Sequence, residues 1–247
     1  MDNIKTKEIS DEKIINLLAA WRKYNSVIAG IFTVLIIFVF PLAFHDYYYD
    51  ILVAKYIFYY GSVILMIVAM LAGVFFFWYK DKREIGGNAV KEMRSNAKLN
   101  ALKMSDWAMI IFLIAVTIST LQSEYRFESF WGNEGRYMGM FLILLYGISF
   151  FVISRCLRYR QWYLDTFLAG GIIACMIGIL HFFKIDPIGF KRGLVGDDYT
   201  IFTSTIGNIN TYTSYVAMVS GMGTVMFSVE KNKYRRLWYL VVAIISL

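Results

Sequence analysis

The residues of this chain best suited to chemistry are three basic side chains close to polar, glycine-containing turns. Arg136 follows Gly135 and precedes an apolar run, and Lys191 and Arg192 lie in a polar segment between two other apolar runs. The planar guanidinium group of arginine can bind two phosphate oxygens at once, and lysine supplies a point charge. The pattern predicts a binding site for an anion such as a phosphate group. In the alternative interpretation, Arg136 only anchors the end of a membrane helix.

A second feature that suits anion binding is the turn formed by Gly207, Asn208 and Asn210. Glycine and asparagine favour sharp turns, and Asn210 or Thr211 is expected to cap the helix that follows. Free N–H groups at the start of a helix attract anions. The alternative, a turn that binds nothing, stays open.

Motifs for nucleophilic or metal-dependent catalysis are absent from the sequence. It contains no P-loop, HExxH, CxxC or GxSxG pattern. His45 and His181 lie far apart without metal-ligand spacing, and both are interpreted as residues at span boundaries. Cys156 and Cys175 are expected to be packing residues and not a disulfide pair. The catalytic residues therefore stay unknown, and neither a metal nor a cofactor is expected.

Long apolar runs position these residues. The chain is 58% hydrophobic and 17% charged, whereas a soluble domain carries about 25% charged residues. Roughly 20 apolar residues in a helix cross the hydrocarbon core of a bilayer. We expect an all-α, polytopic transmembrane bundle, a single membrane domain over residues 1–247. Its six full spans are 26–44, 51–79, 107–121, 137–153, 162–183 and 211–229, and a truncated seventh begins at residue 237. The run 107–121 is short, so thinning of the bilayer or flanking aromatic residues are expected there.

The distribution of charge predicts the orientation. The formal net charge is +7, but most of the 25 basic residues lie in alternate connecting segments, 1–25, 80–106, 154–161 and 230–236. This is the positive-inside pattern of a multi-pass membrane protein with its N-terminus in the cytoplasm, and not a nucleic-acid patch. Residues 122–136 and 184–210 then form outer loops. The first 25 residues are too polar for a cleavable signal peptide.

Two cytoplasmic segments are predicted to form amphipathic helices that lie on the membrane surface. The first has Ser10 as its N-cap, and its apolar face consists of Ile14, Leu17, Leu18 and Trp21. The second begins after the loosening pair Gly86 and Gly87. Its face consists of Val90, Met93, Ala97, Ala101 and Met104, beside Lys91, Arg94 and Lys98. A solvated linker is the alternative for the second segment.

Small residues recur at every fourth position in two spans and predict close helix packing. They are Gly170, Ala174 and Gly178 in one span, and Thr213, Ala217 and Gly221 in the other. We expect these two faces to meet within one chain, with homo-oligomerisation as the alternative. Lys55, Asp165 and His181 lie near span ends, from which they are expected to reach the interface. Charges at mid-depth, which ion-coupled transporters usually bury, are scarce.

Two sequence elements resemble those of the O-antigen ligase/polymerase-like family. The stretch Trp131-Gly-Asn-Glu-Gly-Arg-Tyr-Met-Gly139 resembles a Gly-Arg-Tyr-x-Gly element before a span. The stretch Ser204-Thr-Ile-Gly-Asn-Ile-Asn-Thr-Tyr-Thr-Ser-Tyr-Val-Ala217 is similar to a Thr-Phe-Gly-Asn-Pro-Asn element before another. The resemblance covers roughly residues 105–247. Ile209 departs from it, because proline is usual there.

The resemblance implies an integral membrane enzyme of the glycosyltransferase type. Members move a glycan from a lipid diphosphate carrier of the undecaprenyl type to a lipid, glycan or protein acceptor at the outer face of the cytoplasmic membrane. Arginines hold the diphosphate, and a histidine in a later outer loop activates the acceptor. His181 does not match that histidine. Since members typically have about a dozen spans, this chain is expected to be the N-terminal part of such a protein, and inactive alone.

Two other functions stay open at this point. One is a polytopic transporter or flippase for polysaccharide precursors, which requires polar residues in a central cavity. The other is a non-catalytic membrane scaffold or sensor, which uses the cytoplasmic helices and tolerates replacement of the outer-loop arginines. Ligase and polymerase are not distinguished by these residues.

Overall fold

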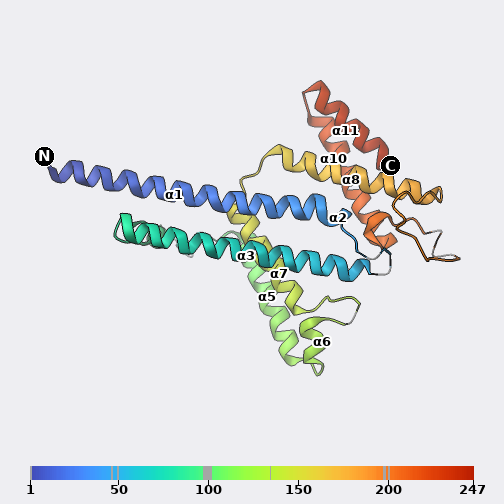
Figure 1. The fold of residues 1–247 in the computed structure, drawn as a ribbon, viewed down its shortest axis with the longest axis horizontal. Helices are drawn as coiled ribbons and strands as arrows, with labels where there is room; N and C mark the ends of the chain where they lie inside the picture. Colours follow the sequence, from blue (N-terminus) through green and yellow to red (C-terminus); the bar gives the residue numbers. More distant parts are fainter. Residues whose placement is uncertain are drawn as a thin grey trace. The chain divides into compact units, whose positions relative to one another are not determined.

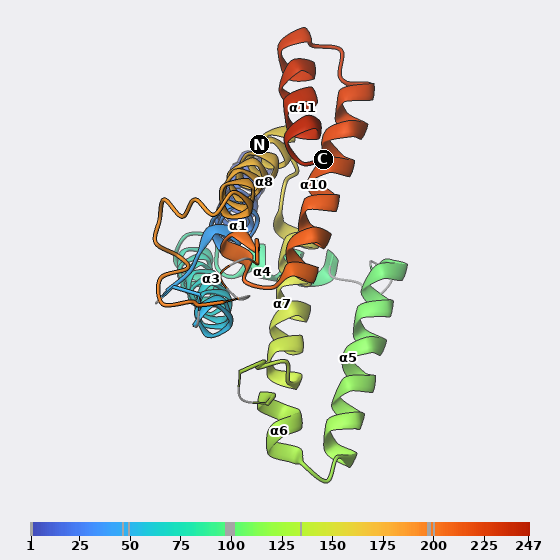
Figure 2. The same ribbon diagram turned by 90° about the vertical axis from the view of Figure 1, so that its right-hand side faces the viewer.

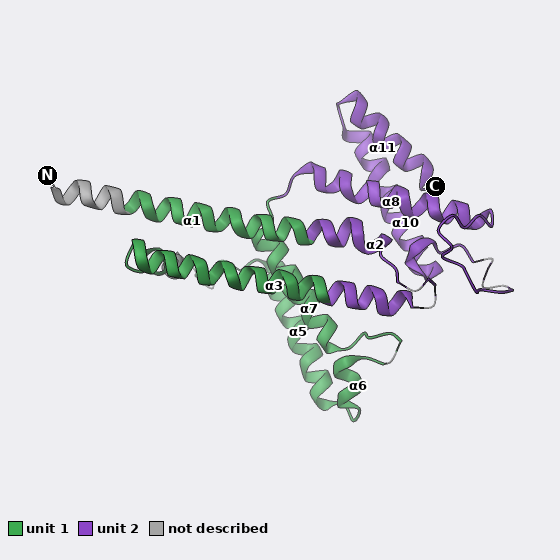
Figure 3. Cartoon of the chain, viewed as in Figure 1, with its two compact units in different colours: residues 1–32, 61–158 green, residues 33–60, 159–247 purple. Residues whose placement is uncertain are grey.

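The computed structural model of the chain describes residues 2–45, 47–48, 50–96, 102–133, 135–196, 199 and 201–247, with only the backbone for 2–10 and 93–96. The described residues form helices and contain no strand (Figure 1). They divide into two compact units, residues 1–32 with 61–158 and residues 33–60 with 159–247 (Figure 3). The first and third helices contribute residues to both units.

Four helical segments of the described chain are long and apolar enough to cross a membrane. They are 11–42, 51–84, 104–122 and 161–182, and they contain most or all of the predicted spans 26–44, 51–79, 107–121 and 162–183. The membrane-protein class is therefore supported. The fourth predicted span lies in a shorter apolar helix, α7 (Met140–Cys156, 17 residues). The sixth lies in α10 (Ile209–Val229, 21 residues), which is richer in serine, threonine and glycine.

The first unit contains α1 (Asp2–Val34), most of α3 (Ile51–Glu84) and the short helix α4 (Asn88–Asn96). A buried apolar cluster joins them, and it consists of Ile14, Leu17, Phe77, Ile85 and Ala89. The prediction of a separate surface helix capped by Ser10 is therefore wrong. Neither proline nor glycine interrupts residues 10–26, so α1 runs on, and its apolar face packs against this chain instead of lipid.

The second predicted surface helix is shorter than expected. Gly86 and Gly87 adopt positive φ angles between α3 and α4. The carboxylate of Asp81 then accepts hydrogen bonds from the backbone N–H groups of Ala89 and Val90, both at 3.0 Å, which fixes the start of α4. Met104 belongs to the next helix. The other members of the predicted face, Met93, Ala97 and Ala101, and the basic residues Arg94 and Lys98 lie outside the described side chains.

The rest of the first unit is a pair of packed helices, α5 (Met104–Gln122) and α7, with the short α6 (Arg126–Trp131) between them (Figure 2). The helix α5 has 19 residues, about 28 Å at 1.5 Å per residue, so it is longer than the run 107–121 predicted. Asp106 makes the extra turn possible, because its carboxylate accepts from the Lys103 N–H at 2.7 Å. The same carboxylate forms an ion pair with Arg155 at the end of α7.

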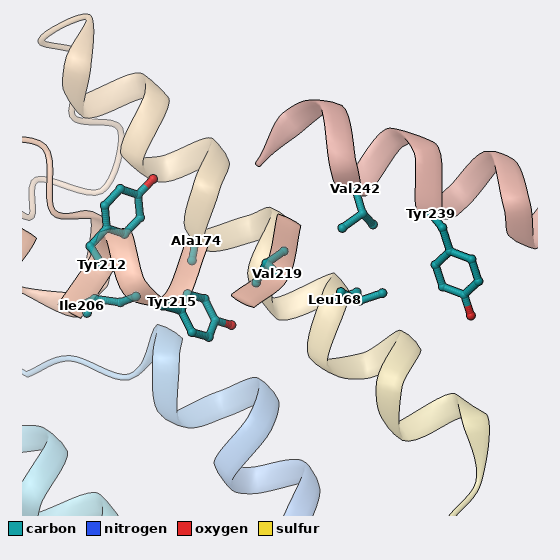
Figure 4. Close-up of a cluster of buried hydrophobic side chains, with 8 residues drawn as sticks. All are labelled: Leu168, Ala174, Ile206, Tyr212, Tyr215, Val219, Tyr239 and Val242. Carbon is teal, nitrogen blue, oxygen red and sulfur yellow. The ribbon is translucent and has the colours of Figure 1, made fainter. Parts of the chain in front are cut away.

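The second unit is built around α8 (Gln161–Phe182), against which α10 and α11 (Lys233–Ile245) pack. Its core cluster contains Leu168, Ala174, Ile206, Tyr212, Tyr215, Val219, Tyr239 and Val242 (Figure 4). Of the predicted stripe on α8, Gly178 meets α10, since a Cβ added there would collide with Tyr212, but Gly170 lies against Phe38 of the π-helix in the first predicted span instead. Gly171, which is outside the stripe, makes the second close contact with α10, at Val219. The predicted stripe on α10 is wrong: Thr213, Ala217 and Gly221 are exposed, and the larger residues of the opposite face fill the contact.

The regular α-helix of the first predicted span is interrupted in the part that belongs to the second unit. The π-helix η1 (Leu35–Val39) follows α1 directly, and a single further turn, α2 (Phe40–Leu42), contains Pro41. Proline lacks an N–H group and displaces the carbonyl of the preceding turn, which explains the wider π turn before it. The predicted span 26–44 is thus a helix with an interrupted outer end.

Candidate functional site

Arg136 lies in a tight loop of the first unit, between α6 and α7. Gly132 has a φ angle of +87°, and a Cβ added there would lie 2.5 Å from the Met138 nitrogen; one added at Gly139 would lie 2.3 Å from the Phe130 carbonyl oxygen. Only glycine permits this close approach of the two ends of the loop. The Arg136 side chain is exposed at the tip of the loop, where it is open to a ligand.

Lys191 and Arg192 belong to the second unit, in a turn that Asp186 organises. The Asp186 carboxylate accepts from the N–H groups of Phe190 at 2.9 Å and Lys191 at 2.7 Å. Its Oδ1 atom also lies 3.6 Å from Nε2 of His181, whose ring stacks on Phe190. These contacts fold the segment after α8 back over the end of that helix.

His181 is therefore buried, with only 1% of its surface exposed, and the expectation that it reaches the interface is wrong. The reason is that Lys184 adopts a left-handed conformation with a φ angle of 60°, which ends α8 and turns the chain back. The returning segment places Phe190 against the imidazole ring, a contact between residues that no helical spacing predicts.

The two basic residues of this turn have different environments. Lys191 is buried, and its ammonium group donates to the carbonyl oxygen of Tyr199 at 2.8 Å. Burial lowers the pKa of Lys191, and the nearby Asp186 opposes this lowering. Arg192 is exposed, its guanidinium carbon lies 5.7 Å from the centre of the Tyr47 ring, and it donates to the Tyr47 hydroxyl at 3.3 Å. Arg192 is thus the better placed of the two to meet a ligand.

The later part of the same loop is anchored inside the second unit. The 3₁₀ turn η3 (Ser204–Ile206) is buried. The Ser204 hydroxyl donates to the Ala174 carbonyl at 2.7 Å, and the Thr205 hydroxyl donates to the Pro41 carbonyl at 2.8 Å. These bonds connect the loop to α8 and to the broken end of the first helix, so the loop is a packed element and not a free connection.

Lys55 completes this anchor. Its ammonium group donates to the carbonyl oxygens of Phe40, Pro41 and Ala43 at 2.8, 3.2 and 3.1 Å. Carbonyls at a helix end lack the usual i+4 partner; the Phe40 carbonyl also accepts from the Ala43 N–H, at 3.3 Å. The expectation that Lys55 reaches the interface is wrong, because the residue is buried and its charge stabilises the break instead.

The N-cap of α10 lies two or three residues earlier than predicted. Gly207 adopts a φ angle of +86° against Ile51, and the next residue, Asn208, is the N-cap. The Asn208 side-chain oxygen accepts from the N–H groups of Asn210 at 2.9 Å and Thr211 at 3.2 Å. Asn210 and Thr211 are therefore inside the helix, and two N–H groups expected to be free for an anion are already bonded.

The second unit contains, at its other end, a polar network around Arg235 that the sequence analysis does not predict. Arg235 forms an ion pair with Asp165 and donates to Gln161 at 2.7 Å. The Tyr239 hydroxyl donates to Asp165 at 2.7 Å, and Gln161 donates to Glu230 at 2.9 Å. Its one signal in the sequence is Asp165, an acidic residue in an otherwise apolar span.

The described side chains do not form a metal centre, since no three His, Cys, Asp or Glu residues among them lie close enough to share an ion. Both cysteines have free thiols. The loops instead present exposed cations. Arg136 of the first unit lies beside a turn that requires glycine, and Arg192 of the second unit lies beside a packed turn. Their union with Lys191 in a single anion site stays a prediction.

Comparison of the chain with protein-family models, with curated proteins and with solved structures finds no match. The resemblance to the O-antigen ligase/polymerase-like family rests on the two sequence elements alone. Each of these elements folds as a turn that starts a helix, the first before α7 and the second before α10.

Proposed function

We propose that this chain forms the carrier-binding part of a membrane enzyme of the glycan ligase or polymerase type. It spans the bacterial cytoplasmic membrane six times with its N-terminus inside, and its outer loops bind a lipid-linked diphosphate. Arg192 contacts the diphosphate, and the glycan passes to an acceptor at the outer face. Arg136, in the loop of the first unit, is a separate candidate anion contact.

The exposed guanidinium group of Arg192, held on Tyr47 by a folded loop, is the observation that carries this proposal. A fixed arginine loses less conformational freedom when it binds a diphosphate than a free one does. Hydrogen bonds of Asp186, Ser204 and Thr205 anchor the described parts of this loop at several points.

The long-range polar contacts support alternating spans. Asp106 pairs with Arg155, and both lie in segments that the charge pattern places inside; Asp165, near the inner end of its predicted span, pairs with Arg235 of another inside segment. The contact of Arg192 with Tyr47 joins two outside segments, and Thr205 of an outer loop contacts Pro41 near the outer end of its predicted span. This pairing agrees with helices that cross the membrane in alternating directions.

The proposal is tested by measuring how the full chain in lipid nanodiscs binds undecaprenyl diphosphate. Replacing Arg136 or Arg192 by alanine is expected to weaken binding about tenfold or more, because a hydrogen bond to a charged group contributes about 1.5–3 kcal/mol. Lys184→Ala is the matched control, since Lys184 is an exposed cation of the same outer loop as Arg192.

Equal weakening by Lys184→Ala would mean that the loop attracts anions without a defined site. Unchanged binding in both arginine variants would contradict the proposal and favour a scaffold.

A further inference from the structure

A groove lies between α1 and α3 in the first unit, away from the outer loops. Its volume is about 460 Å³, and it is lined by small and aromatic side chains, among them Ala20, Trp21, Gly73 and Phe77. This volume is within the range of pockets that hold small ligands, about 300–1,000 Å³.

The walls of the groove are fixed by specific contacts. Gly73 allows the ring of Tyr24 to lie directly against α3, since a Cβ at this position would be 2.3 Å from Tyr24 Cε1. The Tyr24 hydroxyl donates to the Ala69 carbonyl at 2.7 Å, and the rings of Trp21 and Phe77 are 5.1 Å apart. The groove is therefore a feature of the packed helix pair.

The groove carries positive charge. Lys80 is one of its lining residues, and Lys82 and Arg83 follow in the last turn of α3. Among the described side chains, no carboxylate lies within ion-pair distance of the Lys80 ammonium group. An occupant with an apolar body and an anionic end matches this arrangement.

The surroundings of the groove indicate that the occupant comes from the bilayer. Phe76, which lines the groove, and its neighbour Phe75 are 66% and 67% exposed, and an 18-residue window of α3 has a mean hydropathy of 2.4. Trp78 and Tyr79, one turn further, are aromatic residues of the kind that lie at the headgroup level. A groove in this position opens toward lipid.

We propose that this groove binds one anionic phospholipid, with an acyl chain along the surface formed by Trp21, Tyr24 and Phe77 and the headgroup phosphate at Lys80. The proposed orientation places this lipid in the inner leaflet. The site depends on α1 and α3 crossing the membrane, and it does not depend on carrier binding by the outer loops.

The test is native mass spectrometry of the full chain in detergent, titrated with dioleoyl phosphatidylglycerol or dioleoyl phosphatidylcholine. We expect one phosphatidylglycerol molecule per chain, bound about fivefold more tightly than phosphatidylcholine, the preference that one lysine at a membrane surface provides. Lys80→Gln is expected to abolish the preference. Ala72→Phe, which fills the groove from an exposed position, is expected to reduce the binding of both lipids.

Two variants serve as controls. Lys91→Gln removes an exposed charge of α4, and Leu71→Phe enlarges an exposed residue next to Ala72 that does not line the groove. Both are expected to bind phosphatidylglycerol like the unmodified chain. The proposal is overturned if the lipid preference survives Lys80→Gln, or if Ala72→Phe binds lipid normally. It is also overturned if the chain is a dimer that Ala72→Phe dissociates, because a second copy then occupies the groove.

Discussion

Lys55 shows how a single residue determines the local structure of a span. Three carbonyl oxygens at the broken end of the first helix accept hydrogen bonds from its ammonium group, and Thr205 donates to one of the same carbonyls. A buried carbonyl without a donor is costly, and more so where no water is present. The break at Pro41 is therefore stable only because residues 15 and 164 positions away in the chain supply donors.

Replacing Lys55 by methionine is expected to lower the free energy of unfolding by about 2–3 kcal/mol, because three carbonyls lose a charged donor while the apolar stem keeps its packing. The measurement is the unfolding transition of the full chain in micelles, followed by circular dichroism. Lys184→Met, at an exposed position, should change it little. Equal transitions in the two variants would show that the ammonium group does not stabilise the break.

Lys191 is expected to make stability depend on pH. Burial lowers its pKa in the folded chain, whereas the unfolded value is about 10.4. Between these two values the unfolded chain binds more protons, so stability should rise with pH. The unfolding midpoint of the unmodified chain, relative to that of Lys191→Met, should therefore rise with pH above the lowered folded-state pKa and level off above about pH 10.4. A difference that is constant or falls over this range contradicts the burial of a charged ammonium group.

At the scale of elements, the start of α10 depends on one side chain. Asn208 bonds two N–H groups of the first turn, whereas Asn210 is an exposed residue inside the helix. Asn208→Ala is expected to cost about 1 kcal/mol. It should also speed hydrogen exchange at the Asn210 and Thr211 amides. Asn210→Ala is the control, and a larger effect from it would restore Asn210 as the cap.

The helices themselves could be predicted from the sequence, and their partners could not. Apolar length indicated α3, α5 and α8, because a span must satisfy its backbone internally. The contacts of α1 could not be predicted in this way: an apolar face with Ile14 and Leu17 suits lipid and a neighbouring helix equally. The same limit applies to α10, where small residues suggested an interface that Tyr212 and Val219 form instead.

The residues of the candidate site also divide into those that residue type predicts and those that only tertiary contacts explain. The exposed arginines and the turn at Gly207 could be predicted from residue type. The burial of Lys191 and His181 could not, since it results from a loop that folds back through Asp186 and Phe190. Contacts between residues in distant segments, such as Asp165 with Arg235, have no local signal beyond an acidic residue within an apolar run.

At the scale of the whole molecule, the central claim is that the chain crosses the membrane in alternation, with its basic segments inside and the loops 122–136 and 184–210 outside. Among the described residues, the fold supplies four helices of sufficient length and apolarity, and pairs of contacts that agree with this arrangement. This arrangement assigns the anion site to the outer face of the membrane and the lipid groove to the inner face. The two proposed ligands therefore lie in different leaflets.

The most direct measurement is cysteine labelling in intact cells with a membrane-impermeant maleimide, on a background in which Cys156 and Cys175 are replaced by alanine. Single cysteines at the exposed positions Glu124, Lys184, Lys91 and Lys231 report on four connecting segments. We predict that cysteines at 124 and 184 react in intact cells, and that those at 91 and 231 react only after permeabilisation. The reverse pattern, or reaction at all four positions in intact cells, would contradict the account.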